Sequence, residues 1–303
     1  MRTADAAGPA VRELHSVVIT GASRGLGLAS AAQLYRLGWR VVGAMRSPDV
    51  GLERLRAATG AAADDPRLIG VRLDLAEPSS IAAAAKDIEA AVGAPDVLVH
   101  NAGIAAVGCL EDMPTSVFEQ IFATNLLGPI ALTKALLPAM RTAGRGRIVV
   151  VSSQGGSRGM PSISAYSASK GALERWAEAL AEEIAPFGLG ITILICGTFD
   201  TDILTEQTPD YGDYSGPYAG HYAGIRRMGD FIVPLARPPA HFARVLARAV
   251  DERAPFARYP VGFDARLLLL GVRFLPARLL HHLIRLAMGL PRRGSLSERS
   301  SNN

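Results

Sequence analysis

Short apolar runs alternate along the chain with longer stretches in which apolar and polar residues repeat at helical spacing. The runs are rich in β-branched residues and nearly continuous, which predicts strands buried on both faces. We expect six strands, over residues 16–20, 40–45, 68–75, 97–103, 147–153 and 190–196. We expect helices over residues 26–37, 79–92, 117–140 and 165–185. Repeated strand–helix units of this length predict an α/β protein with a doubly wound parallel sheet, a Rossmann fold.

The chain shows no internal repeat and no long linker, so we predict a single domain over residues 14–263. A disordered tail is expected before it, at 1–13. Within it, 200–235 is expected to form a lid over the substrate. A helical extension over 264–290 and a disordered tail over 291–303 complete the prediction.

Composition narrows the classes of function. Hydrophobic residues make up 49% of the 303 residues, enough for a sizeable core. The net charge of +4, without a run of five basic residues, suits an anionic small molecule, and we predict no nucleic-acid partner. Cys109 and Cys196 are the only cysteines, which fits a reducing compartment, and the scattered histidines predict no metal site. With no signal-peptide pattern and no apolar run near 18 residues, a cytoplasmic protein that does not span the membrane is expected.

A glycine-rich stretch, TGASRGLG, joins the first expected strand to the first expected helix. Gly21, Gly25 and Gly27 let the backbone turn tightly and approach a pyrophosphate, while the helix N-terminus offers free N–H groups. The stretch could be a purely structural turn. Its place at the first strand–helix junction of a doubly wound sheet favours a dinucleotide site.

A second stretch, YSASK, places Tyr166 and Lys170 one helical turn apart. The chain has only three lysines against many arginines, which suggests that a compact point charge is wanted here. An ordinary surface pair on a helix is the alternative interpretation.

Four motifs together carry a resemblance to a known family. TGASRGLG, NAG at 101–103, SS at 152–153 and YSASK occur in the order and spacing of the short-chain dehydrogenase/reductase family, over about residues 14–262. Cys196-Gly197 stands where the family commonly has Pro-Gly. This replacement and the long C-terminal region resemble the branch of 17β-hydroxysteroid and retinol dehydrogenases.

The resemblance implies roles for individual residues. The catalytic residues would be Asn125, Ser153, Tyr166 and Lys170. The cofactor-binding residues would be Gly21, Ser23, Arg24, Gly25, Leu26, Gly27, Arg46, Asp74, Asn101, Gly103, Tyr166, Lys170, Thr198 and Thr201. We expect the charge of Lys170, aided by oxidised nicotinamide, to lower the pKa of Tyr166 so that the phenol exchanges a proton near neutrality.

The end of the second expected strand indicates which cofactor is used. Met45 stands where an acidic residue would select NAD, and Arg46 and Arg24 suit a 2′-phosphate, so NADP is predicted. The resemblance then implies hydride transfer between NADP(H) and a secondary alcohol or ketone of an apolar substrate, such as a steroid, a retinoid-like or a polyketide-type molecule. The alternatives are the same reaction with NAD(H) and a catalytically silent NADP-binding scaffold or sensor.

Three features bear on the substrate and on partners. Tyr211, Tyr214, Tyr218 and Tyr222 either line the lid or belong to a loop docked on the protein or on a partner subunit. Residues 276–290 form an amphipathic pattern flanked by arginines, so the 264–290 extension either packs on the protein or makes peripheral membrane contact. Family resemblance implies a homodimer or homotetramer built through the helices at 117–140 and 165–185.

Overall fold

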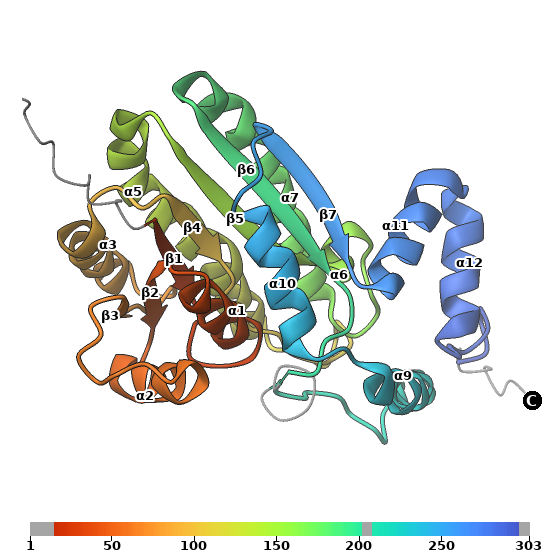
Figure 1. The fold of residues 1–303 in the computed structure, drawn as a ribbon. Coiled ribbons are helices and arrows are strands. Elements are labelled where there is room, and N and C mark those ends of the chain that lie inside the picture. Colours follow the sequence, from red (N-terminus) through yellow and green to blue (C-terminus); the bar gives the residue numbers. More distant parts are fainter. Residues whose placement is uncertain (1–14, 202–207, 297–303) are drawn as a thin grey trace, which may run out of the picture.

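The computed structural model describes residues 15–201 and 208–296. They form a single domain around a parallel sheet of seven strands in the order β3-β2-β1-β4-β5-β6-β7 (Figure 1). The strands are β1 Ser16–Thr20, β2 Arg40–Met45, β3 Leu68–Arg72, β4 Val97–His100, β5 Gly146–Ser153, β6 Leu189–Cys196 and β7 Phe256–Val261. The order reverses between β1 and β4, so the carboxyl ends of these two strands border the crevice of a doubly wound sheet.

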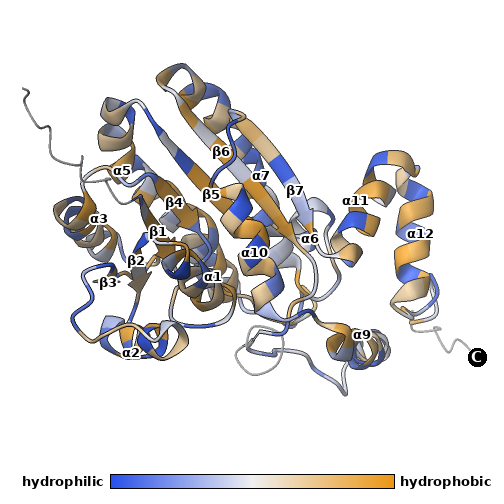
Figure 2. Ribbon diagram, in the orientation of Figure 1, coloured by the Kyte–Doolittle hydropathy of each residue, from blue (hydrophilic) through white to orange (hydrophobic). Residues whose placement is uncertain are grey.

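Helices cover both faces of this sheet, as continuous apolar strands require. They are α1 Gly25–Arg36, α2 Pro48–Thr59, α3 Pro78–Val92, α4 Thr115–Phe122, α5 Gly128–Ala143, α6 Gln154–Ser157, α7 Ser164–Ile184, α9 Ala219–Ile232, α10 Pro239–Ala249, α11 Phe263–Phe274 and α12 Ala277–Ala287. Alternate strand residues enter two separate cores. Val18 packs in the core made with α3, α5 and α7, whereas Val17 and Ile19 pack in the core made with α1, α2 and α10. Hydrophobic colouring follows the strands and the inner sides of these helices in Figure 2.

All six predicted strands are present, but β3 and β4 end at Arg72 and His100, before their predicted limits of 75 and 103. Residues beyond these limits leave the sheet and form loops at its carboxyl edge, where ligands bind in such folds. The sequence analysis missed β7, whose burial is interrupted and which contains Pro260. Both features are typical of an edge strand, and within residues 15–201 and 208–296 β7 pairs with β6 alone.

The predicted helix over 117–140 is interrupted. It consists of α4, a π turn at Ala123–Leu127, and α5. The whole segment Thr115–Ala143 is long and apolar enough to cross a membrane. Ile121 and Leu132 pack in the protein interior, but only 39% of the most apolar window of this segment is buried, and Leu127 is exposed.

The predicted tail at 1–13 lies outside the described residues. Of the predicted tail at 291–303, the structure describes 291–296 as irregular and turn residues beside the end of α12. The predicted helical extension is two helices, α11 and α12, which project from one side of the domain (Figure 1). Residues 202–207 of the predicted lid are outside the described part, and 219–232 form α9.

Candidate active site

The glycine-rich loop has the geometry of a dinucleotide cradle. Gly21 and Gly25 have φ of 69° and 54°, a region that favours glycine. A side chain on Gly27 would place its Cβ 2.2 Å from the Gly21 carbonyl oxygen, so α1 can pack against the loop only with glycine there. Arg24 is the N-cap residue of α1 and gives no side-chain cap, and the first turn holds no acid. The first N–H groups of α1 therefore keep their capacity to bind phosphate, and the loop fits a nicotinamide dinucleotide.

Ser23 and Leu26, two further predicted cofactor residues, lie in this loop and at the start of α1. Both are half-buried, and Leu26 packs against the core that includes α1. Thr201 approaches the loop from the segment after β6, with its Cγ2 3.4 Å from where a Cβ on Gly25 would lie. The structure thus brings Thr201 to the glycine loop, and its predicted contact with the cofactor stays a prediction.

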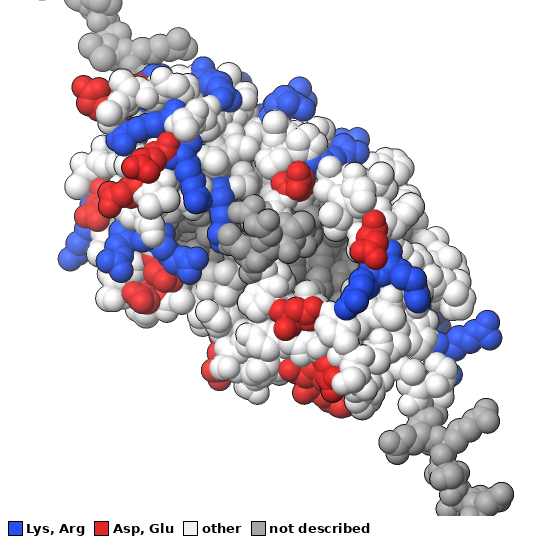
Figure 3. Space-filling view, turned by 90° about the horizontal axis from the view of Figure 1, so that it is seen from below, with Lys and Arg blue, Asp and Glu red and all other residues white. Residues whose placement is uncertain are grey.

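Arginines surround the end of β2 on the carboxyl face of the sheet. Arg46 is exposed directly after the strand, and Arg24 is half-buried in the glycine loop. Arg54, from α2, places Nη1 3.4 Å from the Ser23 carbonyl oxygen and was missed by the sequence analysis. Figure 3, which views this face, shows Lys and Arg side chains over its α1–α2 half. Met45 is buried and its side chain lies against Gly51, so an apolar residue occupies the position where an acid would select NAD.

Two of the predicted cofactor-binding residues, Asp74 and Asn101, also shape the loops at the sheet edge. The Asp74 carboxylate accepts the Ala76 N–H at 2.9 Å and closes the turn after β3. Asn101 Nδ2 donates to the Thr20 carbonyl at 2.9 Å and ties the end of β4 to the end of β1. Through this hydrogen bond Asn101 stabilises the carboxyl edge of the sheet.

Asn125 is fully buried in the π turn that interrupts the helix. Its Oδ1 accepts the Ile104 N–H at 2.8 Å, and its Nδ2 donates to the Ile104 carbonyl at 2.9 Å and to the Ser169 hydroxyl at 3.0 Å. A Cβ on Gly103 would lie 3.3 Å from both Asn125 Oδ1 and Lys170 Nζ. Gly103, Asn125 and Lys170 therefore converge. π turns of this kind occur frequently at functional sites.

Lys170 is buried, and its Nζ donates to the Val151 carbonyl at 2.9 Å. Burial lowers its pKa to about 8, while Cys196 and Glu174 act in the opposite direction. The ammonium charge is therefore held at a substantial cost in desolvation.

Tyr166 and Ser153 meet beside this lysine. A Cβ on Gly155 would lie 3.6 Å from Ser153 Oγ and 3.7 Å from Tyr166 Cε1, which puts both side chains at the start of α6. Burial raises the pKa of Tyr166 to about 12, and its hydrogen bond with Ser153 opposes the rise. The expectation that Lys170 lowers this pKa is not met within the chain, because Nζ binds Val151 and lies 6.0 Å from the Tyr166 ring centre. Burial is the main cause of the raised pKa, and Lys170 is not among the groups that shift it.

The turn after β6 is held by a residue that the sequence analysis missed. The Thr198 N–H donates to the Asp264 carboxylate at 2.6 Å. That carboxylate occupies the space of a side chain at Gly197, whose Cβ would lie 2.0 Å from Asp264 Oδ1. Asp264 begins α11, 66 positions beyond Thr198, so no local pattern signals the contact. Burial raises the pKa of Cys196 to about 12, which keeps it a thiol.

A buried carboxylate also lies one turn beyond Lys170. Glu174 accepts the Ser152 hydroxyl at 2.6 Å and forms an ion pair with Arg258 from β7. Ser152 thus points away from Ser153, as strand alternation predicts. Because β7 was missed, this anchor for α7 was missed with it.

The tyrosine-rich segment is docked on the protein. The Tyr222 hydroxyl accepts the Cys109 N–H at 2.6 Å and donates to Asp112, and its ring is buried. Tyr211 and Tyr214 are exposed outside α9, and Tyr218 is its N-cap residue. The four tyrosines do not line one helical face, because the residues before Tyr218 are irregular.

A glycine cradle at the strand–helix junction, with half-buried Ser153 and Tyr166 and buried Lys170 beside it, defines a class of nicotinamide-dependent oxidoreductase. Residues 15–212 match the short chain dehydrogenase family, and the chain belongs to the short-chain dehydrogenase/reductase family.

Named relatives and solved structures agree with this assignment. Dehydrogenase/reductase SDR family member 7B of Xenopus tropicalis is 35% identical over 244 residues, which cover 78% of this chain and 74% of that protein. The 3-ketodihydrosphingosine reductase of Bacteroides thetaiotaomicron is 35% identical over 205 residues, 65% of this chain and 71% of that protein. A short-chain dehydrogenase structure from Streptomyces avermitilis superposes with a TM-score of 0.77 at 33% identity, covering 94% of this chain and 99% of that one. A metagenomic short-chain oxidoreductase in complex with NADP gives a TM-score of 0.64 at 29% identity, covering 82% and 96%.

Proposed function

We propose that the protein transfers a hydride between NADP(H) and a secondary alcohol or ketone on a largely apolar substrate. The observation that carries this proposal is the meeting of Tyr166, Ser153 and Lys170 at the carboxyl edge of the sheet, beside a glycine cradle suited to a pyrophosphate. When bound, the nicotinamide supplies or accepts the hydride, and its oxidised ring adds positive charge.

Three side chains bind the substrate oxygen, transfer its proton and stabilise charge. The Ser153 hydroxyl hydrogen-bonds the substrate oxygen, and Tyr166 gives that oxygen a proton in reduction or takes one in oxidation. Lys170, held between the Val151 carbonyl and the Asn125 region, places one positive charge behind the phenol. Burial raises the pKa of Tyr166, so the phenol is protonated at neutral pH, which is the form that ketone reduction requires.

The choice of NADP rests on the guanidinium groups near the end of β2. Arg46, Arg24 and Arg54 offer three cations for a 2′-phosphate, and the structurally similar metagenomic enzyme was solved with NADP. A charge-reversing Arg46→Asp variant should raise the KM for NADPH by roughly tenfold or more and leave that for NADH little changed.

The apolar substrate is supported by a relative and by the lid. The relative named a 3-ketodihydrosphingosine reductase acts, by its name, on the keto group of a lipid. Here Tyr211 and Tyr214 lie exposed on the segment that carries α9. A cytoplasmic homodimer or homotetramer remains part of the proposal, on family resemblance.

The test is NADPH oxidation, followed by nicotinamide absorbance, with a panel of aliphatic, aromatic and long-chain ketones. Tyr166→Phe should lower turnover by at least about a thousandfold while NADPH binding, measured by fluorescence, is retained. Unchanged turnover in this variant would refute the proposed function. Binding of NADPH without turnover of any ketone would favour the scaffold alternative.

A further inference from the structure

The two C-terminal helices expose an apolar stripe. In α11, Phe263, Leu267, Leu270 and Phe274 repeat at spacings of four, three and four residues, so they share one face. Their exposed fractions are 66%, 60%, 55% and 69%. In α12, Leu279, Leu283 and Leu286 repeat in the same way and are also exposed. Figure 2 shows hydrophobic colouring along both helices.

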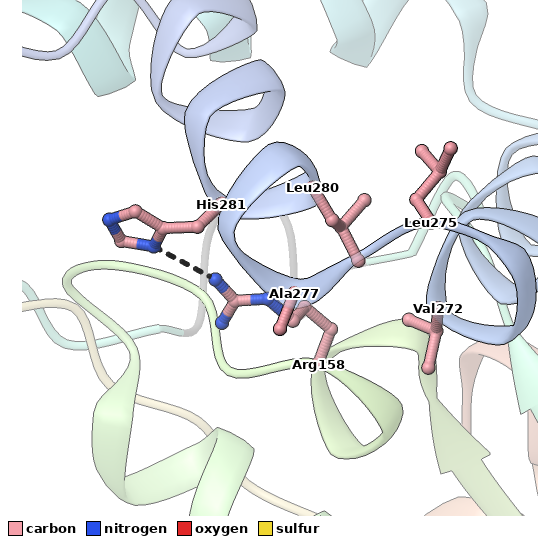
Figure 4. Close-up of a pocket in the computed structure, with 6 residues that line it drawn as sticks. All are labelled: Arg158, Val272, Leu275, Ala277, Leu280 and His281. Atoms are coloured by element: carbon pink, nitrogen blue, oxygen red, sulfur yellow. Dashed lines mark hydrogen bonds between the residues drawn. The ribbon is translucent and has the colours of Figure 1, made fainter.

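The same helices satisfy their packing with other residues. Leu280 is the buried residue of α12, and its Cδ1 lies 3.2 Å from where a Cβ on Gly271 would be. Figure 4 shows Leu275, Leu280 and Val272 around a cavity of about 370 Å³ between the helices. Arg158 Nη2 contacts His281 Nδ1 at 3.2 Å and joins α12 to the body of the domain. The hairpin is therefore fixed from its inner side, while the side chains of the outer stripes keep about 44–69% of their surface exposed among the described residues.

The segment that carries these stripes is also rich in positive charge. The segment 263–296 contains six arginines: Arg266, Arg273, Arg278, Arg285, Arg292 and Arg293. Its single acidic residue, Asp264, is committed to the Thr198 N–H. None of the ion pairs among the described residues involves the six arginines. The segment thus combines exposed leucine and phenylalanine with uncompensated positive charge.

A groove at the base of the hairpin shows the same combination. It has a volume of about 1160 Å³ and lies between α7, β7 and α11. Arg266 and Arg273 line it together with Leu269, Leu270 and Val272. Such a lining suits an anionic headgroup joined to an acyl chain.

We propose that α11 and α12 form a docking surface for an anionic lipid bilayer. Apolar side chains would enter the interface and the arginines would bind lipid phosphates and carboxylates. A second copy of the chain is a poorer occupant, because a twofold contact would bring this positive surface against itself. This docking proposal does not depend on the proposed reaction, because none of the side chains assigned to the bilayer contact is a predicted active-site residue.

The test is co-sedimentation of the full-length protein with vesicles of phosphatidylcholine alone or with 30% phosphatidylserine. The protein should bind the anionic vesicles at least about tenfold more strongly, and salt should weaken this binding. A triple variant, Leu267→Glu, Leu270→Glu and Phe274→Glu, should lose about tenfold or more. The matched control is Leu37→Glu, an equally exposed leucine after α1, which should bind as the wild type does.

Circular dichroism and NADPH oxidation with a water-soluble ketone would show that each variant is folded. Equal vesicle binding by the wild type and the folded triple variant would overturn the proposal, as would absence of binding to anionic vesicles. It would equally be overturned if the triple variant changed a dimer into a monomer without altering vesicle binding, because a second copy would then be the occupant.

Discussion

Lys170 should be required for catalysis but should lower the stability of the folded protein, and Lys170→Met tests both expectations. The side chain is 3% exposed, and burial lowers its pKa from 10.5 to about 8. The difference between these pKa values corresponds to about 3 kcal/mol against the charged form at pH 7. Methionine removes that cost but also the hydrogen bond to the Val151 carbonyl, which contributes about 1 kcal/mol. The variant should therefore be more stable by about 2 kcal/mol, and inactive.

The pH dependence gives the sharper test. Between about pH 8 and 10.5 the unfolded chain keeps a proton on Lys170 that the folded protein has released. Wild-type stability therefore rises with pH across this window. Because methionine does not titrate, the stability advantage of Lys170→Met should be complete below about pH 8 and disappear toward pH 10.5.

Urea unfolding at pH 7 and at pH 9.5, followed by tryptophan fluorescence, measures both effects in the cofactor-free protein. Lys134→Met is the matched control, because Lys134 is exposed on α5 and its replacement should change the free energy of unfolding by less than about 0.5 kcal/mol. A Lys170→Met protein that is less stable than wild type, or whose advantage does not vary with pH, would refute the reasoning.

Three further changes follow from the buried polar contacts. Asn125→Ala should destabilise the protein by about 3 kcal/mol in urea unfolding, because it leaves the backbone N–H and C=O of Ile104 without partners. Asp264→Ala should raise the KM for NADPH about tenfold through loss of the Thr198 contact, with partial rescue by Asp264→Asn; an unchanged KM would contradict that role. Burial lowers the pKa of His100 to about 3. Between about pH 6.5 and 3 the unfolded chain therefore binds a proton that the folded protein does not, so stability decreases as the pH is lowered. His100→Gln should flatten this fall in acid titrations monitored by circular dichroism, and an unchanged slope would exclude His100 as its source.

Sequence pattern was sufficient for the elements whose burial is uniform. β1, β2 and β6 are buried at nearly every position and mostly apolar, so their limits could be predicted from the sequence to within a residue. β7 could not be predicted in this way, since its exposed positions and Pro260 are tolerated only at the edge of a sheet. The break at Ala123–Leu127 was also hidden, because apolar periodicity continues across the π turn.

The site residues also differ in how far they could be predicted from the sequence. Tyr166, Lys170 and the glycines belong to short motifs, so their positions could be predicted from local spacing. The contacts of Asp264 and Glu174 depend on elements that are distant in the chain, and no local signal announces them. The raised pKa of Tyr166 in the chain without its cofactor could not be predicted, for a physical reason. Spacing shows that a lysine is near, but not that its Nζ is bound to a carbonyl while burial acts on the phenol.

The C-terminal helices are part of the active-site architecture rather than an appendage to it. Through Asp264, α11 fills the space beside Gly197 and fixes the turn expected to meet the nicotinamide. At its other end the hairpin contacts α9, since a Cβ on Gly224 would lie 2.6 Å from the Gly289 carbonyl oxygen. α9 in turn holds the loop after β4 through the Tyr222 hydroxyl. The hairpin is therefore linked to the site through Asp264 and through α9. Variants that weaken either contact should alter cofactor binding and substrate binding together.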